Sequence, residues 1–226
     1  FQANTNTYAS LCKLKEYYEP FLKREDIIGL SIATRSDCIT DECLEYLENI
    51  NKRTFLTVEL GLQTIHDKTA KLINRCSSLK EFEDMVKKLR EKNINVVVHI
   101  INGLPYETKD MMIETVKYLN TLDITGIKIH MLHILKDTPL EIYYQKHKFK
   151  VLTKEEYVDI VTTQLEYLRK EIVIHRLTGD PDPKNIIEPT WLIKKFTVLN
   201  DIDKLMVAKD IYQGDKVKEN YEKSKN

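Results

Sequence analysis

The stretch that decides the fold is Phe55-Leu-Thr-Val-Glu-Leu-Gly-Leu-Gln63. Side chains along a β-strand point alternately to its two faces. One face of this stretch carries only leucine and valine, whereas the other turns polar towards its carboxyl end, at Glu59 and Gln63. A strand of a parallel barrel packs one face on helices, and its inner face carries polar groups where the lumen holds a ligand. The stretch therefore predicts a barrel strand with a ligand-binding end.

The rest of the chain alternates predicted strands with predicted helices. Short apolar runs bounded by turn residues predict strands at residues 29–35, 54–64, 94–101, 126–134 and 172–177, after the end of a strand at 1–6. Capping residues and helical periodicity predict helices at residues 10–24, 40–51, 68–74, 78–92, 109–119 and 153–171, with two more near 190 and 201. This alternation indicates an α/β fold with a parallel sheet. A full eight-unit barrel needs about 250 residues, so a shorter chain predicts an open or partial (β/α) TIM-type barrel.

We expect residues 1–215 to form that partial barrel with a C-terminal extension, and residues 216–226 to form a charged tail. Lysine and arginine total 35, aspartate and glutamate also total 35, and the formal net charge is zero. Such a balance does not indicate a nucleic-acid partner or an anionic membrane. No apolar run reaches the roughly 18 residues of a membrane span. The first residues, which lack a methionine and a signal peptide, predict a fragment or a processed product.

The four cysteines are Cys12, Cys38, Cys43 and Cys76. No two of them form a Cys-x-x-Cys pair, and four cysteines in a chain of 226 residues are too few for a disulfide scaffold. We expect free thiols in the reducing cytoplasm. We also expect no metal site built from these cysteines alone.

Arg75 follows Glu59 and Gln63 after one predicted helix. Carboxylate and amide oxygens accept hydrogen bonds from ribose hydroxyls or an amino group, and a guanidinium offers a planar fork to a carboxylate. The three side chains together are suited to an amino acid joined to a nucleoside. The alternative is an internal ion pair between Glu59 and Arg75, which the spacing alone favours.

Several longer segments resemble the radical S-adenosylmethionine (SAM) superfamily. They are Glu59-Leu-Gly-Leu-Gln-Thr-Ile-His-Asp-Lys-Thr69, Ile73-Asn-Arg75, His99-Ile-Ile-Asn-Gly-Leu-Pro-Tyr-Glu-Thr108 and Gly126-Ile-Lys-Ile-His-Met-Leu-His-Ile-Leu-Lys136, with shorter matches at residues 1–7, 33–37 and 175–179. Within the superfamily they are most similar to the YhcC-like group, which is related to the elongator catalytic subunit and to oxygen-independent coproporphyrinogen oxidase. The resemblance covers nearly the whole chain.

The resemblance implies that SAM binds in the lumen and that a 4Fe–4S cluster cleaves it reductively to a 5′-deoxyadenosyl radical. Gln63 matches the SAM-contacting glutamine of the family, and Arg75 matches the arginine that takes the SAM carboxylate. Ile101 and Gly103 fall in an element that resembles the family's Gly-x-Ile-x-Gly-x-x-Glu segment beside the adenine. His99 replaces the leading glycine of that segment, and three residues rather than two separate Gly103 from Glu107.

The family's Cys-x3-Cys-x2-Cys cluster motif does not occur in the sequence. The resemblance places it before residue 1, which implies that the first strand-helix unit is missing and that the strand at 172–177 is an addition to the barrel. Residues 2–7 stand where many family members grip the SAM amino group, with Asn4 and Asn6 as candidate substitutes. The cofactor-binding residues implied are thus Asn4, Asn6, Glu59, Gln63, Arg75, Ile101 and Gly103.

The function implied is that of a radical SAM enzyme of the oxidoreductase type whose substrate the sequence does not identify. The family implies a flavodoxin or ferredoxin as electron donor, and this chain without cluster cysteines is expected to be inactive alone. Substrate contacts are expected from the loops at residues 136–139 and 179–183. Two alternatives remain: a nucleotide-binding barrel without redox chemistry, and a tRNA-modifying enzyme.

Overall fold

The computed structural model describes residues 1–2 and 5–217 and alternates helices with strands. In chain order the elements are α1 (Leu11–Leu22), β1 (Gly29–Thr34), η1 (Ser36–Cys38), α2 (Asp41–Arg53), β2 (Phe55–Gln63), α3 (Asp67–Leu72), α4 (Leu79–Glu91), β3 (Asn95–Asn102), α5 (Lys109–Leu119), β4 (Gly126–Met131), β5 (Ile134–Leu135), α6 (Pro139–His147), α7 (Lys154–Tyr167), β6 (Val173–Arg176), β7 (Ile186–Glu188), η2 (Thr190–Lys194) and α8 (Lys195–Lys209).

Five strands form one sheet in the order β1-β2-β3-β4-β6. The pairs β1/β2 and β2/β3 are parallel, and Glu59 stands in register with Ala33 on one side and Val97 on the other. The predicted α/β fold with a parallel sheet is confirmed. The prediction that the strand near residue 172 is only an addition is wrong, because β6 is a member of this sheet. A second sheet, in which β5 pairs antiparallel with β7, was not predicted.

The chain divides into two compact units. Unit 1 consists of Phe1–Ile100 and Leu122–Lys128, and unit 2 consists of Ile101–Thr121 and Ile129–Asn226. The sequence predicted a single barrel over residues 1–215 and gave no sign of this division, which falls inside β3 and β4.

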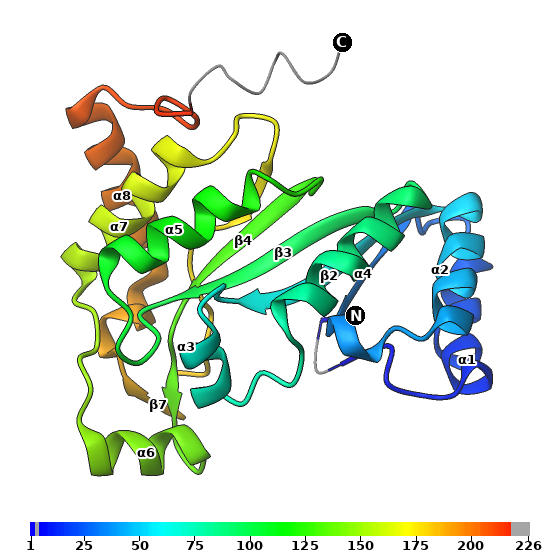
Figure 1. The fold of residues 1–226 in the computed structure, drawn as a ribbon, viewed down its shortest axis with the longest axis horizontal. Coiled ribbons are helices and arrows are strands. Elements are labelled where there is room, and N and C mark those ends of the chain that lie inside the picture. Colours follow the sequence, from blue (N-terminus) through cyan, green and yellow to red (C-terminus); the bar gives the residue numbers. More distant parts are fainter. Residues whose placement is uncertain (3–4, 218–226) are drawn as a thin grey trace. The chain divides into compact units, whose positions relative to one another are not determined.

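In unit 1, α1 and α2 lie side by side, and α2 packs against β2 (Figure 1). The apolar face of β2 is completely buried: Leu56, Val58, Leu60 and Leu62 have no exposed surface. The opposite face of the strand is therefore the one that is free to carry polar groups, as the alternation predicted.

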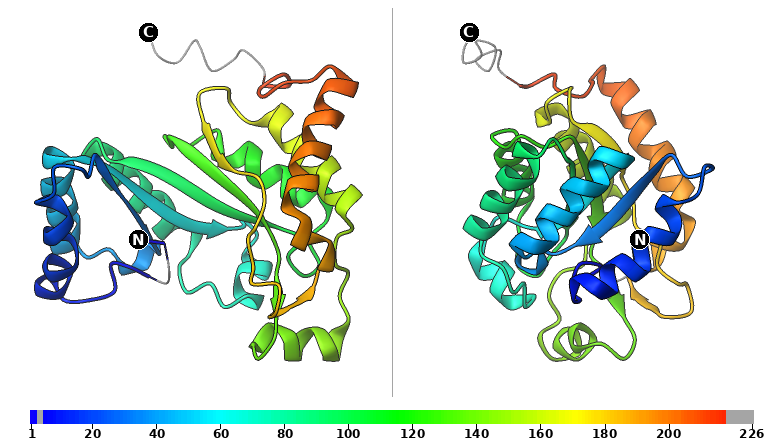
Figure 2. Two further views of the ribbon diagram at one scale, coloured as in Figure 1. Left: turned by 180° about the vertical axis from the view of Figure 1, so that it is seen from behind. Right: turned by 90° about the vertical axis from the view of Figure 1, so that its right-hand side faces the viewer.

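In unit 2, α7 packs against both α5 and α8 (Figures 1 and 2). Tyr157 on α7 is fully buried, and its hydroxyl donates to the carbonyl oxygen of Leu177 at 2.9 Å. That hydrogen bond satisfies the one polar atom of a large core side chain and ties α7 to the segment after β6.

The first residues run alongside β1. The amino group of Phe1 donates to the Ser31 carbonyl at 2.8 Å, and the Ala33 amide donates to the Phe1 carbonyl at 2.8 Å. Successive bonds from residue 1 to residues 31 and 33 are the pattern of a parallel ladder. None of the described residues at 1–6 is assigned to a strand, but these bonds agree with the predicted end of one.

The helices begin where their capping residues stand. Both predicted capping boxes are present, at Ser78 with Glu81 and at Thr153 with Glu156. The sequence did not predict α6 as a complete helix: its first residue falls in the loop expected at residues 136–139, none of its residues is buried, and it shows no apolar stripe. No described helix is long and apolar enough to cross a membrane.

Ser78→Ala should lower the free energy of unfolding by about 1 kcal/mol, because the hydroxyl caps the Glu81 amide at the start of α4. Ser10 is the matched control, since it stands at the N-cap of α1 without a capping hydrogen bond from its side chain. Urea denaturation of the two variants should show a loss for Ser78→Ala alone. Equal losses would contradict the assignment.

Candidate functional site

Glu59 lies at the centre of a buried polar cluster in unit 1. Its Oε2 accepts from Lys128 Nζ at 2.6 Å and lies 2.8 Å from His99 Nε2. Its Oε1 accepts from Ser31 Oγ at 2.5 Å and from Gln2 Nε2 at 3.3 Å. Three strands and the N-terminal segment thus supply partners to one carboxylate, and we call these five residues the Glu59 cluster.

The cluster is largely excluded from solvent, since the Glu59 and Lys128 side chains are 4% and 7% exposed, whereas the His99 side chain is 25% exposed. Burial alone raises the pKa of Glu59. The hydrogen bonds from His99, Lys128 and Ser31 outweigh that effect and hold the pKa of the Glu59 carboxyl well below its ordinary value. Glu59 is therefore a carboxylate at neutral pH, and Gln2 is the exposed member of the cluster.

The internal ion pair between Glu59 and Arg75 is not formed. Glu59 forms its ion pair with Lys128 and lies within hydrogen-bond distance of His99, while Arg75 donates to backbone carbonyls. Lys128 lies on β4 and His99 on β3, and both side chains reach the Glu59 carboxylate on the inner face of the sheet. These two residues therefore take the place that Arg75 was expected to fill.

Gln63 ends β2 in a left-handed conformation, with φ of 61°. The ladder to β3 is irregular here, because Gly61 pairs with His99 and Gln63 pairs with Ile100, leaving Leu62 as an extra residue. A Cβ atom added to Gly61 would lie 2.3 Å from Gln63 Nε2. The Gln63 amide thus occupies the place of a side chain at residue 61, on the same face as Glu59. The amide makes no hydrogen bond to any residue that the structure describes, so it is available to a ligand.

Arg75 follows α3, which begins after the carboxyl end of β2 (Figure 1). Its Nη1 donates to the carbonyl oxygens of Leu62, at 2.9 Å, and Thr64, and its Nε donates to the Ser77 carbonyl at 2.8 Å. Burial lowers the pKa of the guanidinium, which nonetheless stays protonated. Arg75 and Gln63 are therefore neighbours at the end of β2, as the sequence predicted.

The other predicted cofactor residues are placed as follows. Asn6 binds the end of β1, where its backbone and side-chain nitrogens both donate to the Ala33 carbonyl, at 3.1 and 2.9 Å. Asn4 lies outside the described residues. Ile101 and Gly103 belong to unit 2, where Gly103 has φ of 81° and its amide contacts Met112 Sδ. The positive φ explains the glycine.

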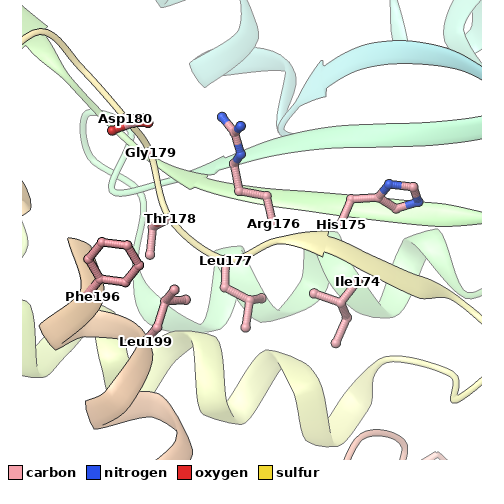
Figure 3. Close-up of a pocket in the computed structure, with 9 residues that line it drawn as sticks. All are labelled: Ile174, His175, Arg176, Leu177, Thr178, Gly179, Asp180, Phe196 and Leu199. Carbon is pink, nitrogen blue, oxygen red and sulfur yellow. The ribbon is translucent and has the colours of Figure 1, made fainter. Parts of the chain in front are cut away.

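Unit 2 contains a cavity of about 350 Å³ beside β6 and the loop that follows it. Nine residues line it, namely Ile174, His175, Arg176, Leu177, Thr178, Gly179, Asp180, Phe196 and Leu199. Figure 3 shows Phe196 and Leu199 on the same side of the chain as Leu177, with the Arg176 guanidinium on the opposite side. The cavity includes part of the loop predicted to contact substrate, and its lining combines charged and apolar groups.

The described residues do not fit a 4Fe–4S cluster. Cys38 and Cys43 are buried, Cys12 and Cys76 are exposed, and no three histidine, cysteine, aspartate or glutamate side chains in the described ranges gather as metal ligands. Cluster iron is held by several thiolates at once. A cluster cannot therefore be assigned to any of these four residues.

The sequence pattern of the Radical SAM superfamily matches residues 5–119, and that of the Radical SAM C-terminal domain matches residues 124–208. The chain belongs to the radical SAM superfamily. Within it the chain is similar to the YhcC-like group. This superfamily uses SAM together with a 4Fe–4S cluster and an electron donor.

Curated relatives match the chain over nearly its whole length. It is 47% identical over 214 residues to YtqA of Bacillus subtilis, covering 95% of this chain and 66% of that protein. It is 34% identical to a protein of Methanocaldococcus jannaschii, covering 95% and 67%, and 28% identical to YhcC of Escherichia coli, covering 91% and 67%. The chain thus spans about two thirds of the length of these relatives.

Two solved structures share the fold. Elp3 of Methanocaldococcus infernus superposes with a TM-score of 0.75 at 19% identity, covering 88% of this chain and 46% of that one. The coproporphyrinogen III oxidase HemN of Escherichia coli gives 0.57 at 18% identity, covering 72% and 38%. These similarities confirm the partial TIM-type barrel.

Sequence reasoning missed Lys128, Ser31 and Gln2 as partners of Glu59. Ser31 and Lys128 fall in the predicted strands at 29–35 and 126–134 without an assigned role, and His99 was noted only as a departure from the family pattern. A usable signal existed: a lysine inside the β-branched strand Gly126–Met131 is a buried cation, and a buried cation requires an acidic partner. Glu59 is the acidic residue inside a predicted strand.

Lys128→Met should lower the free energy of unfolding by about 3–5 kcal/mol, because it removes the cation and leaves a buried carboxylate short of its partner. Lys80→Met is the control, since its pair with Asp84 is solvent-exposed and should contribute little to stability. Denaturant unfolding at pH 7 measures both. A loss below about 1 kcal/mol for Lys128→Met would contradict the coupling.

The stability that Glu59 contributes should depend on pH in one direction. Its folded pKa lies below the ordinary value, so the contribution is complete above about pH 4.5 and disappears as pH falls towards the lowered pKa. The difference in unfolding free energy between wild type and Glu59→Gln should therefore be constant from pH 7 to 5 and shrink below pH 4.5. Unfolding curves between pH 7 and 3 measure it, and a difference that grows on acidification would refute the assignment.

Proposed function

We propose that the protein is a radical SAM enzyme and that this chain provides its SAM-binding barrel. The observation that carries the proposal is the carboxamide of Gln63. It lies over Gly61 on the polar face of β2, and it has no hydrogen-bond partner in the described parts of the chain. A half-buried amide with both functions unused at the carboxyl end of a barrel strand is suited to a polar ligand.

The neighbouring groups suit a cationic nucleotide that carries an amino acid. Glu59 is held as a carboxylate on the same face by Lys128, and the His99 side chain beside it is 25% exposed. Asn6 is held at the end of β1 by hydrogen bonds to Ala33 and Phe1. Bound SAM supplies a 5′-deoxyadenosyl radical on one-electron reduction, and the chain's own residues bind and orient it.

In the described ranges no three histidine, cysteine, aspartate or glutamate side chains gather as metal ligands, and the sequence has no Cys-x3-Cys-x2-Cys spacing. We infer that this chain alone holds no 4Fe–4S cluster and does not cleave SAM, whereas the full-length protein does both with a flavodoxin or ferredoxin as electron donor.

The test of this function uses the full-length protein, reconstituted anaerobically with iron and sulfide. We expect the absorbance of a 4Fe–4S cluster, binding of labelled SAM in equilibrium dialysis, and release of 5′-deoxyadenosine after reduction with dithionite. A protein that carries its cluster but neither binds nor cleaves SAM would overturn the proposal.

Gln63→Ala should weaken SAM binding by the full-length protein about tenfold, because one or two hydrogen bonds of about 1 kcal/mol each are lost. Gln145→Ala is the matched control, since Gln145 lies on the exposed helix α6 and bonds Glu141. Equilibrium dialysis gives both dissociation constants. Equal affinity in the Gln63→Ala variant and the control would show that the amide does not contact the ligand.

A further inference from the structure

The backbone at Gln63 makes a tight three-residue turn. The Thr64 amide donates to the Leu62 carbonyl at 2.7 Å, across Gln63 with its φ of 61°. A γ-turn with positive φ at its central residue is rare and strained, and glutamine has no special tolerance for the left-handed region. Some other part of the structure must therefore hold Gln63 in this conformation.

Arg75 supplies that support. Its Nη1 donates to the carbonyls of Leu62 and Thr64, the two residues that flank Gln63. One guanidinium nitrogen thus bridges the two ends of the turn, and the Leu62 carbonyl accepts from both Arg75 and Thr64.

The position of Arg75 follows from how α3 ends. Asn74 takes a left-handed conformation with φ of 57°, the Asn74 amide donates to the Lys71 carbonyl, and the Arg75 amide donates to the Ala70 carbonyl. This pair of bonds is the Schellman arrangement that closes a helix and reverses the chain. It sends Arg75 back towards the end of β2, and the Nε bond to Ser77 fixes the guanidinium from the other side.

The turn decides where the Gln63 amide lies. Folding back at Gln63 brings its Nε2 to the space over Gly61, where a Cβ atom would be 2.3 Å away. In a regular strand the same side chain would stand one pleat further along. The amide therefore lies over Gly61 only while the turn persists.

The remaining donors of Arg75 are few. A guanidinium has five N–H donors. Nη1 uses its two on Leu62 and Thr64, and Nε uses its one on Ser77. Only Nη2 makes no hydrogen bond to a described residue, so a two-point grip on a ligand carboxylate would require breaking a bond to the backbone.

We propose that Arg75 is a positioning residue that holds the turn at Gln63 and so aims its amide across Gly61, in place of the two-point grip on the SAM carboxylate. This inference rests on the proposed function for its ligand, but the backbone contacts that it uses do not depend on a ligand.

The first experiment compares two probes on the full-length protein: SAM, and 5′-methylthioadenosine, which lacks the amino-acid group. Arg75→Met should weaken both probes by the same factor, about tenfold, as should Gln63→Ala. The double variant R75M/Q63A should bind no more weakly than either single one, because both changes remove the same aimed amide. Gly61→Ala, which leaves Arg75 intact and displaces the amide, should give the same loss.

An Arg75→Met variant that loses affinity for SAM but keeps it for 5′-methylthioadenosine, while Gln63→Ala weakens both probes, would overturn the proposal, and so would additive losses in the double variant. If wild type binds neither probe, the proposed function fails, and the role of Arg75 is then decided by the ligand-free measurement that follows.

The second experiment measures hydrogen exchange at the Thr64 amide without ligand. Arg75→Met should speed this exchange at least tenfold, and adding Gln63→Gly should restore protection, because glycine adopts a positive φ without strain. Arg53→Met, which breaks a surface pair with Glu19, should leave Thr64 unchanged. Unaltered Thr64 exchange in Arg75→Met would overturn the proposal whether or not SAM binds.

Discussion

The packing of unit 1 depends on hydrogen bonds to one buried carboxylate, that of Glu59. Glu59 is buried between two neighbouring strands, and an isolated carboxylate in that environment would take up a proton or destabilise the fold. Four hydrogen bonds from three strands and the N-terminal segment prevent this. Each partner approaches from a different part of the sequence, so the carboxylate can be satisfied only when β1, β3 and β4 are all paired in register.

The end of β2 serves two purposes within five residues. Glu59 organises the strands around it, and Gln63 offers an unsatisfied amide on the same face. The residue between them on that face is glycine, and a side chain there would displace the Gln63 amide from the space that it occupies. One strand thus carries both a fully paired charge at Glu59 and an unpaired neutral amide at Gln63. The paired charge makes the strand rigid, and the unpaired amide is able to bind a ligand.

Local signals predicted the elements well. Apolar runs located the strands of the large sheet, and two capping boxes located the starts of α4 and α7. The full extent of the exposed helix α6 and the short pair β5/β7 were not predicted, because neither has a periodic apolar face. The division into two units was also missed, since it falls inside strands and leaves no mark in composition.

The candidate site was predicted in part, for a similar reason. Gln63 and Arg75 were placed together by a family pattern, and the structure brings them together. The partners of Glu59 come from residues 2, 31, 99 and 128, and strand order, which sets such contacts, is not encoded by any short window. The contacts of Arg75 with backbone carbonyls could not be predicted either, because every residue has a carbonyl group and the sequence does not distinguish one from another.

The closing of α3 has a consequence for how this segment can vary. Arg75 lies thirteen positions after Leu62, and the six-residue helix between them sets the direction in which its side chain leaves the chain. One residue more or fewer would swing the guanidinium by about 100° around the helix axis, away from the carbonyls it bridges. Length in this connection is therefore as constrained as the identity of its last residue, and substitutions on the outer surface of α3 should be tolerated far more readily than insertions.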